Sequence, residues 1–166
     1  MGPIKILFLL IFNITVFAYS SESLNNFFSS NLSFVQTTIN SIDNSFNKSY
    51  GKFYRYSDNS IMVEVNKPFR ETYKISKKGV EIHDLDFNQK RFITNEDISN
   101  RLLNYINTGF PKNLSNIEII NNSSFKIIVS EKIYHFEFTD KRTLQIKYKD
   151  NMNLDTLINF TKNNVN

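Results

Sequence analysis

Residues 61–75 read IMVEVNKPFRETYKI and decide the fold class. Apolar and polar side chains alternate along them, and turn residues at 66–68 divide the stretch into two runs. One face of these runs carries Ile61, Val63, Val65, then Phe69, Glu71, Tyr73 and Ile75. A period of two is typical of a β-strand with one buried face, so the stretch predicts two strands joined by a short turn.

The same alternation returns in the second half of the chain. It forms three short runs, at Phe125/Ile127/Val129, Tyr134/Phe136/Phe138 and Leu144/Ile146/Tyr148. Turn residues bound the runs at a spacing of about ten residues. Short strands spaced in this way predict a mainly β (α+β) protein with an antiparallel sheet, built as a sandwich or a barrel.

A first helix is predicted near residue 21. Leu24, Phe27 and Phe28 lie there at the spacing i, i+3, i+4, which is typical of a short amphipathic helix.

A second helix is predicted between the two sets of strands. Its apolar stripe consists of Ile98, Leu102, Leu103 and Ile106. Thr94 or Asn95 is its candidate cap, and Gly109 and Pro111 end it. With a single sheet, a helix at this place in the chain has to cover the concave face or an open end.

The first twenty residues have the layout of a secretory signal peptide. Lys5 precedes an apolar run from Ile6 to Ala18, and Ala18 and Ser20 are small enough for a cleavage site. The run is shorter than the about twenty apolar residues that span a bilayer, and an uncleaved anchor is the alternative. We therefore expect an exported protein with a signal at residues 1–20 and one domain at residues 21–166.

The composition excludes several kinds of site. Cysteine is absent, which excludes disulfides, a thiol nucleophile, a zinc-thiolate site and a lipid-modified N-terminal cysteine. The formal net charge is +4, and the Lys and Arg residues are scattered along the chain. Because nucleic-acid binding needs a basic cluster or stripe, we expect no nucleic-acid partner.

No catalytic pattern stands out. The two histidines, His83 and His135, lie in different predicted strands with no motif around either. Gly occurs only four times, which leaves no glycine-rich phosphate loop. We therefore expect a binding protein, not an enzyme, with no metal and no cofactor.

Aromatic residues are numerous, with 16 Phe and 8 Tyr. Several predicted strands are apolar on both faces, at residues 52–56, 125–129 and 133–138. One interpretation is a thick core, and the other is a curved sheet whose inner face lines an apolar cavity. Composition alone favours the thick core.

A series of short motifs follows in order from Leu32 to Gln89. They are Ser33-Phe34-Val35-Gln36, Gly51-Lys52-Phe53-Tyr54, the alternating run from Ile61 to Val65 with Pro68 after it, and Gly79 followed by His83-Asp84-Leu85-Asp86-Phe87-Asn88-Gln89. Asn159-Phe160-Thr161 adds a closing strand. In this order the motifs resemble those of the periplasmic outer-membrane lipoprotein carrier family LolA.

The resemblance implies an incomplete antiparallel β-barrel with helices forming a lid over an apolar cavity. It implies a monomeric periplasmic chaperone that shields the acyl chains of lipoproteins and delivers them to the outer membrane. The implied partners are acylated lipoproteins, the inner-membrane lipoprotein-releasing transporter and, if present, an outer-membrane lipoprotein receptor. The alternatives are an exported carrier of the same fold with another apolar cargo, and a secreted interaction domain without ligand.

The expected acyl-chain site combines strand residues with the lid helix. It consists of Phe34, Phe53, Ile61, Val63, Val65, Tyr73, Leu102, Leu103 and Ile106. Apolar contacts suit such a ligand because each buried CH₂ contributes about 0.8 kcal/mol without a directional partner. The alternative for each residue is ordinary core packing.

The chain departs from the family pattern at several points, and one of them concerns the transfer of the ligand. The family has an Arg-Pro pair before the alternating strand, and its arginine is implicated in lid closure and ligand transfer. This chain has Ser57-Asp58 there, with Arg55 and Arg70 nearby. The sequence assigns that role to neither arginine.

Overall fold

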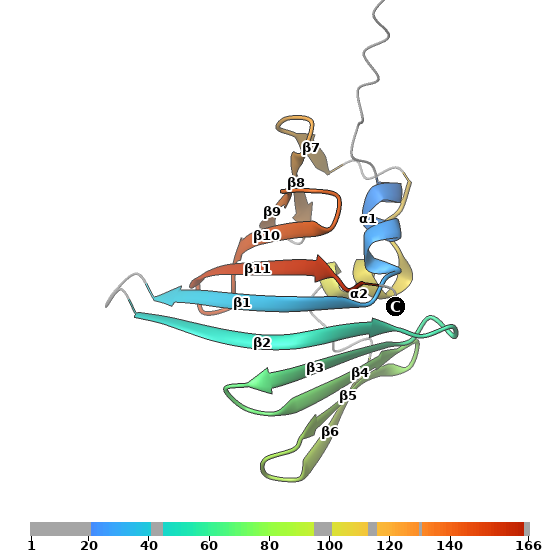
Figure 1. Cartoon of the computed structure of the whole chain (residues 1–166), viewed down its shortest axis with the longest axis vertical. Coiled ribbons are helices and arrows are strands. Elements are labelled where there is room, and N and C mark those ends of the chain that lie inside the picture. Colours follow the sequence, from blue (N-terminus) through green and yellow to red (C-terminus); the bar gives the residue numbers. More distant parts are fainter. Residues whose placement is uncertain (1–20, 41–44, 95–100, 113–115, 130, 165–166) are drawn as a thin grey trace, which may run out of the picture.

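One antiparallel sheet makes up most of the computed structural model, which describes residues 21–40, 45–94, 101–112, 116–129 and 131–164. Its eleven strands follow the order β6-β5-β4-β3-β2-β1-β11-β10-β9-β8-β7. They are β1 (Leu32–Asn40), β2 (Ser45–Arg55), β3 (Ile61–Lys67), β4 (Glu71–Ser76), β5 (Gly79–Asp84), β6 (Gln89–Thr94), β7 (Ile117–Ile119), β8 (Ser124–Val129), β9 (Lys132–Phe138), β10 (Thr143–Lys149) and β11 (Asp155–Lys162). The first and last strands, β1 and β11, pair in the middle and join the two halves (Figure 1).

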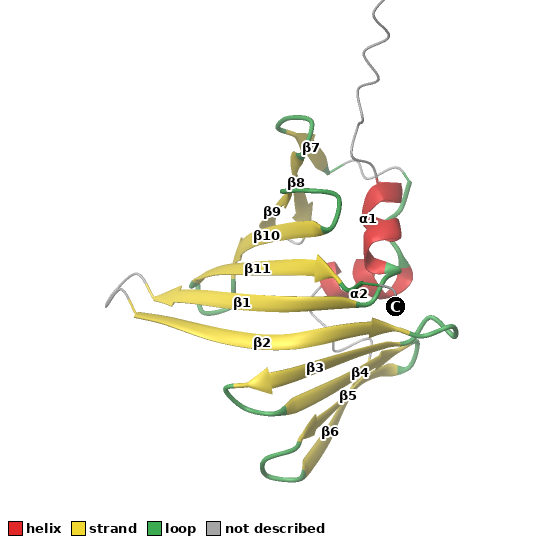
Figure 2. Cartoon of the chain, viewed as in Figure 1, coloured by secondary structure: helices red, strands yellow, loops and turns green. Residues whose placement is uncertain are grey.

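Two helices lie in the described part of the chain, α1 (Ser21–Phe28) and α2 (Arg101–Thr108). Figure 2 shows both near the end of the sheet where β1 begins. We call this the helix end of the sheet, and the opposite end, which holds the β3–β4 and β5–β6 turns, the open end. Neither helix is long and apolar enough to cross a membrane.

The mainly β class, the antiparallel strands and both helices agree with the prediction. The predicted second strand starts later than expected, because Phe69 and Arg70 lie in the turn and β4 begins at Glu71. Arg70 is held there by an ion pair of 2.8 Å from its Nε to Asp86 Oδ1, and its carbonyl accepts the Leu85 N–H. The predicted signal peptide, the candidate cap Asn95 and the first turn of the second helix lie outside the described residues. Thr94, the other candidate cap, is the last residue of β6.

The strand register gathers the alternating apolar residues on one face. Phe34 lies opposite Phe160 on one side and Gly51 on the other, while Val63 lies between Phe53 and Tyr73. Because directly opposite residues point to the same side of a sheet, these side chains share what we call the inner face. Gly51 has a specific reason to be glycine, because a Cβ there would lie 2.4 Å from the ring of Phe34.

α1 packs on the inner face through aromatic rings. The Phe27 ring contacts that of Phe138 at a centroid distance of 5.7 Å. The Phe28 ring lies 5.5 Å from Phe160 and 5.9 Å from Phe53. Edge-to-face pairs of this kind add about 0.5–1.5 kcal/mol to the burial of the rings. Many of the Phe residues therefore form a thick core at the helix end.

Candidate apolar binding site

A small apolar cavity lies on the inner face beside α2. Its volume is about 180 Å³. The strands contribute Phe34, Gln36, Phe53, Val63, Tyr134, Ile146, Tyr148, Ile158 and Phe160, and α2 contributes Leu102, Leu103 and Ile106. Among the described residues, the lining has no ionisable group except the tyrosine hydroxyls. The cavity is therefore suited to an uncharged apolar ligand.

The structure brings together most of the predicted acyl-chain residues. Phe34, Phe53, Val63, Leu102, Leu103 and Ile106 all line the cavity. Ile61 does not line it, because it lies closer to the helix end with no exposed surface. It belongs to the packed core.

Val65 and Tyr73 also lie outside the cavity lining, towards the open end of the inner face. Val65 is paired with Glu71, and the Tyr73 hydroxyl donates a hydrogen bond to the Glu71 carboxylate. Burial, followed by this contact with Glu71, raises the pKa of Tyr73 above its ordinary value. The inner face is thus more polar here than the alternation of residues 61–75 suggests.

Several lining residues were not part of the prediction, namely Gln36, Tyr134, Ile146, Tyr148, Ile158 and Phe160. Most come from strands β9, β10 and β11. Their apolar alternation was visible in the sequence. The sequence did not show that β11 pairs with β1. This pairing places the C-terminal strands next to Phe34 in the sheet.

Arg55 connects both helices to the sheet. It lies at the end of β2, and its Nε donates a hydrogen bond of 2.9 Å to the carbonyl of Phe28, the last residue of α1. Its guanidinium also donates to the carbonyls of Ile106 and Asn107 in the last turn of α2. These carbonyls lack partners within their helices, and a cation there also interacts favourably with the helix dipole. Burial lowers the pKa of Arg55, but arginine stays charged in proteins.

α1 is also tied to the segment that follows α2. The Asn25 side chain accepts the Phe110 N–H at 2.7 Å and donates to the Phe110 carbonyl at 3.0 Å. Ser21 Oγ donates to the Pro111 carbonyl at 2.6 Å. The two helical segments therefore form one connected cover at the helix end.

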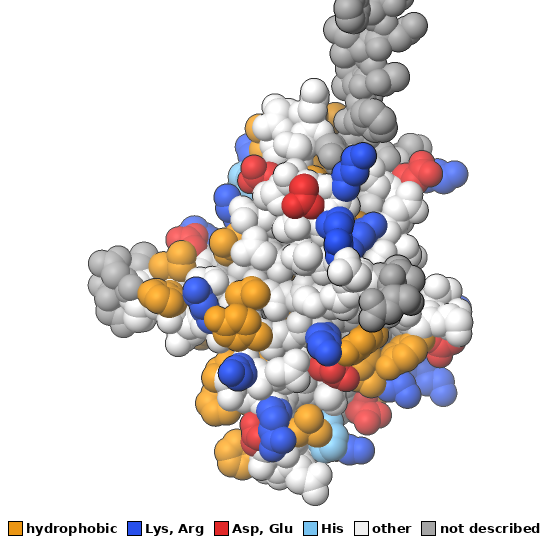
Figure 3. Space-filling view, in the orientation of Figure 1, with side chains coloured by type: hydrophobic (Ala, Val, Ile, Leu, Met, Phe, Trp, Pro, Cys, Tyr) orange, Lys and Arg blue, Asp and Glu red, His pale blue; other side chains and the backbone are white. Residues whose placement is uncertain are grey.

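The exposed surface differs in chemistry from the cavity. Figure 3 shows small groups of hydrophobic side chains separated by Lys, Arg, Asp and Glu. On the face opposite the cavity, ion pairs join Lys147 to Glu137 at 3.8 Å and Lys149 to Asp155 at 3.0 Å. The described residues contain no group of three or more His, Asp and Glu side chains that could hold a metal ion.

Neither a protein-family model nor a curated protein matches the chain. Among solved structures, the chain is similar to a LolA superfamily protein from Nitrosomonas europaea. The superposition has a TM-score of 0.46 and 10% sequence identity, and it covers 90% of this chain and 96% of that chain.

Proposed function

We propose that this protein is a periplasmic carrier that binds the acyl chains of lipoproteins released from the inner membrane and delivers them to the outer membrane. The observation that supports it most is the apolar cavity between α2 and the inner face, whose described lining residues are uncharged. The proposed action is binding and release, without a chemical step. The proposed partners are acylated lipoproteins, the inner-membrane lipoprotein-releasing transporter and, where one exists, an outer-membrane receptor.

The energetics of an acyl chain fit such a site. Each CH₂ removed from water contributes about 0.8 kcal/mol, so a lipoprotein crossing an aqueous compartment needs a shielded place for its chains. Apolar contacts are non-directional, so a chain can leave in the same way as it entered. Phe34, Val63 and Leu103 offer such contacts from three elements.

In this proposal α2 is the lid, and Arg55 is the latch that holds it. Entry of a long chain has to move Leu102, Leu103 and Ile106 away from the sheet, because the cavity holds only about 180 Å³. Such a movement breaks the hydrogen bonds from Arg55 to the carbonyls of Ile106 and Asn107. Arg55 would thus take the part that the resemblance gives to an arginine near this strand.

The test compares two glutamate substitutions on neighbouring residues of β3. Val63→Glu places a carboxylate in the cavity, whereas Met62→Glu places one on the opposite face of the same strand. The full chain, with its signal, is co-expressed with a triacylated lipoprotein and its release machinery, and the purified protein is examined by mass spectrometry. We expect wild type and Met62→Glu to carry the lipoprotein and Val63→Glu to lose it, while circular dichroism shows all three to be folded.

Other outcomes identify the alternatives. Absence of lipoprotein from the wild type counts against the carrier. If a smaller apolar molecule copurifies in its place, the protein is a carrier of another cargo, which the small cavity would also suit. Ile61 is unsuitable for this test, because it has no exposed surface and a glutamate there would destabilise the core.

A further inference from the structure

Strands β9 and β10 pair along only part of their length. Their paired residues run from Leu144 opposite Phe138 to Lys147 opposite His135. β9 nevertheless begins at Lys132, and β10 continues to Lys149. The two strands therefore separate towards the open end of the sheet.

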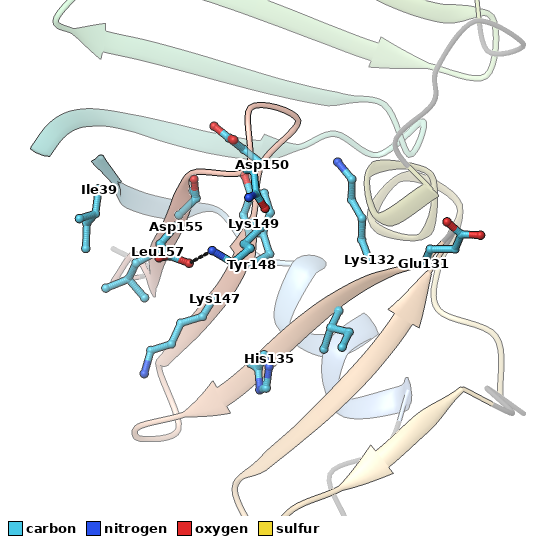
Figure 4. A pocket seen from close by; sticks show the side chains of 13 residues that line it. Ile39, Glu131, Lys132, His135, Lys147, Tyr148, Lys149, Asp150, Asp155 and Leu157 are labelled. Atoms are coloured by element: carbon cyan, nitrogen blue, oxygen red, sulfur yellow. Dashed lines mark ion pairs between the residues drawn. The ribbon is translucent and has the colours of Figure 1, made fainter. Parts of the chain in front are cut away.

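A cleft with a volume of about 770 Å³ lies at this separation. Figure 4 shows it with Ile39 and Leu157 on one side and Glu131 and Lys132 on the other. Ile133, Lys147 and Leu157 line it from the outer face, while Tyr148 and Thr156 belong to the inner face. Because successive side chains point to opposite faces of a strand, a cleft lined by both sets reaches both sides of the sheet.

Tyr148 lies between this cleft and the cavity beside α2. Tyr148 lines both spaces. Its ring contacts that of Tyr134, with the centroids 5.3 Å apart, at the point where the strand pairing has ended. Tyr148 is therefore the described residue at which the two spaces meet.

The sizes of the two spaces differ in a way that matters for a long alkyl chain. An apolar cavity of about 150 Å³ holds a molecule the size of benzene, and ligand pockets usually measure about 300–1,000 Å³. The cavity of about 180 Å³ is too small for a whole long acyl chain, whereas the cleft of about 770 Å³ is within the usual range.

The charges around the cleft favour an uncharged occupant over an anionic headgroup. Two of its three lysines are in ion pairs, Lys149 with Asp155 and Lys147 with Glu137, and Lys132 donates a hydrogen bond to the uncharged Asn151 side chain. Asp150 accepts the N–H groups of Met152 and Leu154 within its own turn. Glu131 and His135 also line the cleft, and its apolar contacts for a ligand come from Ile39, Ile133, Leu157 and the Tyr148 ring.

We propose that the β9–β10 cleft is a second subsite for the alkyl chain. In this arrangement the first part of a long chain occupies the cavity beside α2, and its far end passes Tyr148 into the cleft. The inference rests on the proposed function, since it extends the same ligand from one space to the next.

The absence of Trp from the chain allows a direct test with single-tryptophan reporters. Leu103→Trp reports on the cavity, and Ile133→Trp reports on the cleft. Phe92→Trp is the matched control, because Phe92 lies on β6 with 57% of its surface exposed and lines neither space. The probes are octanoate and palmitate brominated at the terminal carbon, used below their micelle concentrations, with the unbrominated acids as blanks.

We expect brominated octanoate to quench Leu103→Trp, brominated palmitate to quench Ile133→Trp, and neither acid to quench Phe92→Trp. Quenching of Leu103→Trp by palmitate without quenching of Ile133→Trp would overturn the second subsite and leave the cavity in place. Quenching of all three reporters would indicate binding over the whole surface and would also overturn it. If neither acid quenches Leu103→Trp or a second cavity reporter, Ile106→Trp, the proposed function itself is wrong.

Discussion

The helix end and the open end of the inner face both carry apolar side chains but differ in how they are covered. Along each of four strands, the residue nearer the helices is buried and the next one on the same face is partly exposed. The pairs are Ile61 and Val63 in β3, Ile75 and Tyr73 in β4, Ile146 and Tyr148 in β10, and Phe160 and Ile158 in β11.

The difference comes from the helices and not from the strands. Phe27 and Phe28 of α1 cover the helix end, and Phe28 contacts rings from α1, β2, β11 and the segment after α2. Towards the open end no such ring layer is present among the described residues, and the apolar side chains there line a cavity instead. One alternating pattern can therefore supply core at one end of a strand and a binding surface at the other.

The largest effect is expected from removing the centre of the helix end. Phe28→Ala should lower the free energy of unfolding by about 3–5 kcal/mol, because the ring is almost fully buried among four others. Urea unfolding measures this. Phe87→Ala at the open end is the control, with an expected change within about 0.5 kcal/mol because the side chain is 70% exposed. Equal losses in the two variants would contradict the comparison.

A matched pair on one strand tests the comparison more closely. Ile61→Ala should cost about 2–5 kcal/mol of unfolding free energy, since Ile61 is fully buried at the helix end. Val65→Ala, on the same face of β3, should cost about 1 kcal/mol, because Val65 is only partly buried. Chemical denaturation of both variants checks the order. A loss at Val65 as large as that at Ile61 would show that the open end is packed as tightly as the helix end.

Alkaline pH should destabilise the protein through the tyrosine between the two spaces. Burial raises the pKa of Tyr148 to about 12, above the ordinary value of about 10. Between these pH values the unfolded chain loses a proton that the folded chain keeps, so the free energy of unfolding falls as the pH rises. The loss due to Tyr148 is at most about 3 kcal/mol.

Unfolding curves below and above this window measure the effect. Tyr148→Phe removes the hydroxyl and should have a shallower pH dependence than the wild type. Tyr73 and Tyr134 also have raised pKa values, so only the difference between wild type and variant reports on Tyr148. Identical pH profiles would mean that Tyr148 is as hydrated as it is in the unfolded chain.

The smallest effect is expected at the latch. Arg55→Lys keeps the charge but loses the planar fork that reaches the carbonyls of Phe28, Ile106 and Asn107, and should cost about 1–2 kcal/mol. Hydrogen exchange should become faster in α1 and α2 than in β1. Arg70→Lys is the control, because its ion pair with Asp86 is exposed and contributes little to stability. Unchanged exchange in both helices would exclude Arg55 as the latch.

The local patterns of the sequence were enough to predict the elements. Strands β3, β8, β9 and β10 follow from alternation, and both helices follow from apolar spacing, because these periods depend only on neighbours in the chain. The boundary at Phe69 was wrong. The contacts of Arg70 with Asp86 and Leu85, from the next hairpin, hold that residue in a turn.

The candidate site was predicted in part. The cavity brings together Phe34, Phe53, Val63 and the α2 residues. Alternation along the strands and apolar spacing along the helix place these side chains on surfaces that face each other. Ile61 points to the same face of β3 as Val63 but lies in the packed core at the helix end. Alternation shows which face a side chain is on, but not how far along the strand the core extends. Tyr134, Tyr148 and Ile158 were missed because they reach the cavity through strand order alone.

The sequence by itself determined which face of each strand and helix is apolar, since that depends on the order of side chains along the backbone. Only the tertiary structure decided which part of the apolar face is packed against α1 and which part lines a cavity. β1 pairs with β11, and Arg55 donates hydrogen bonds to three carbonyls of the two helices. Both sets of contacts join residues that are far apart in the chain. Such contacts form only when the sheet has its final register, so no local pattern encodes them.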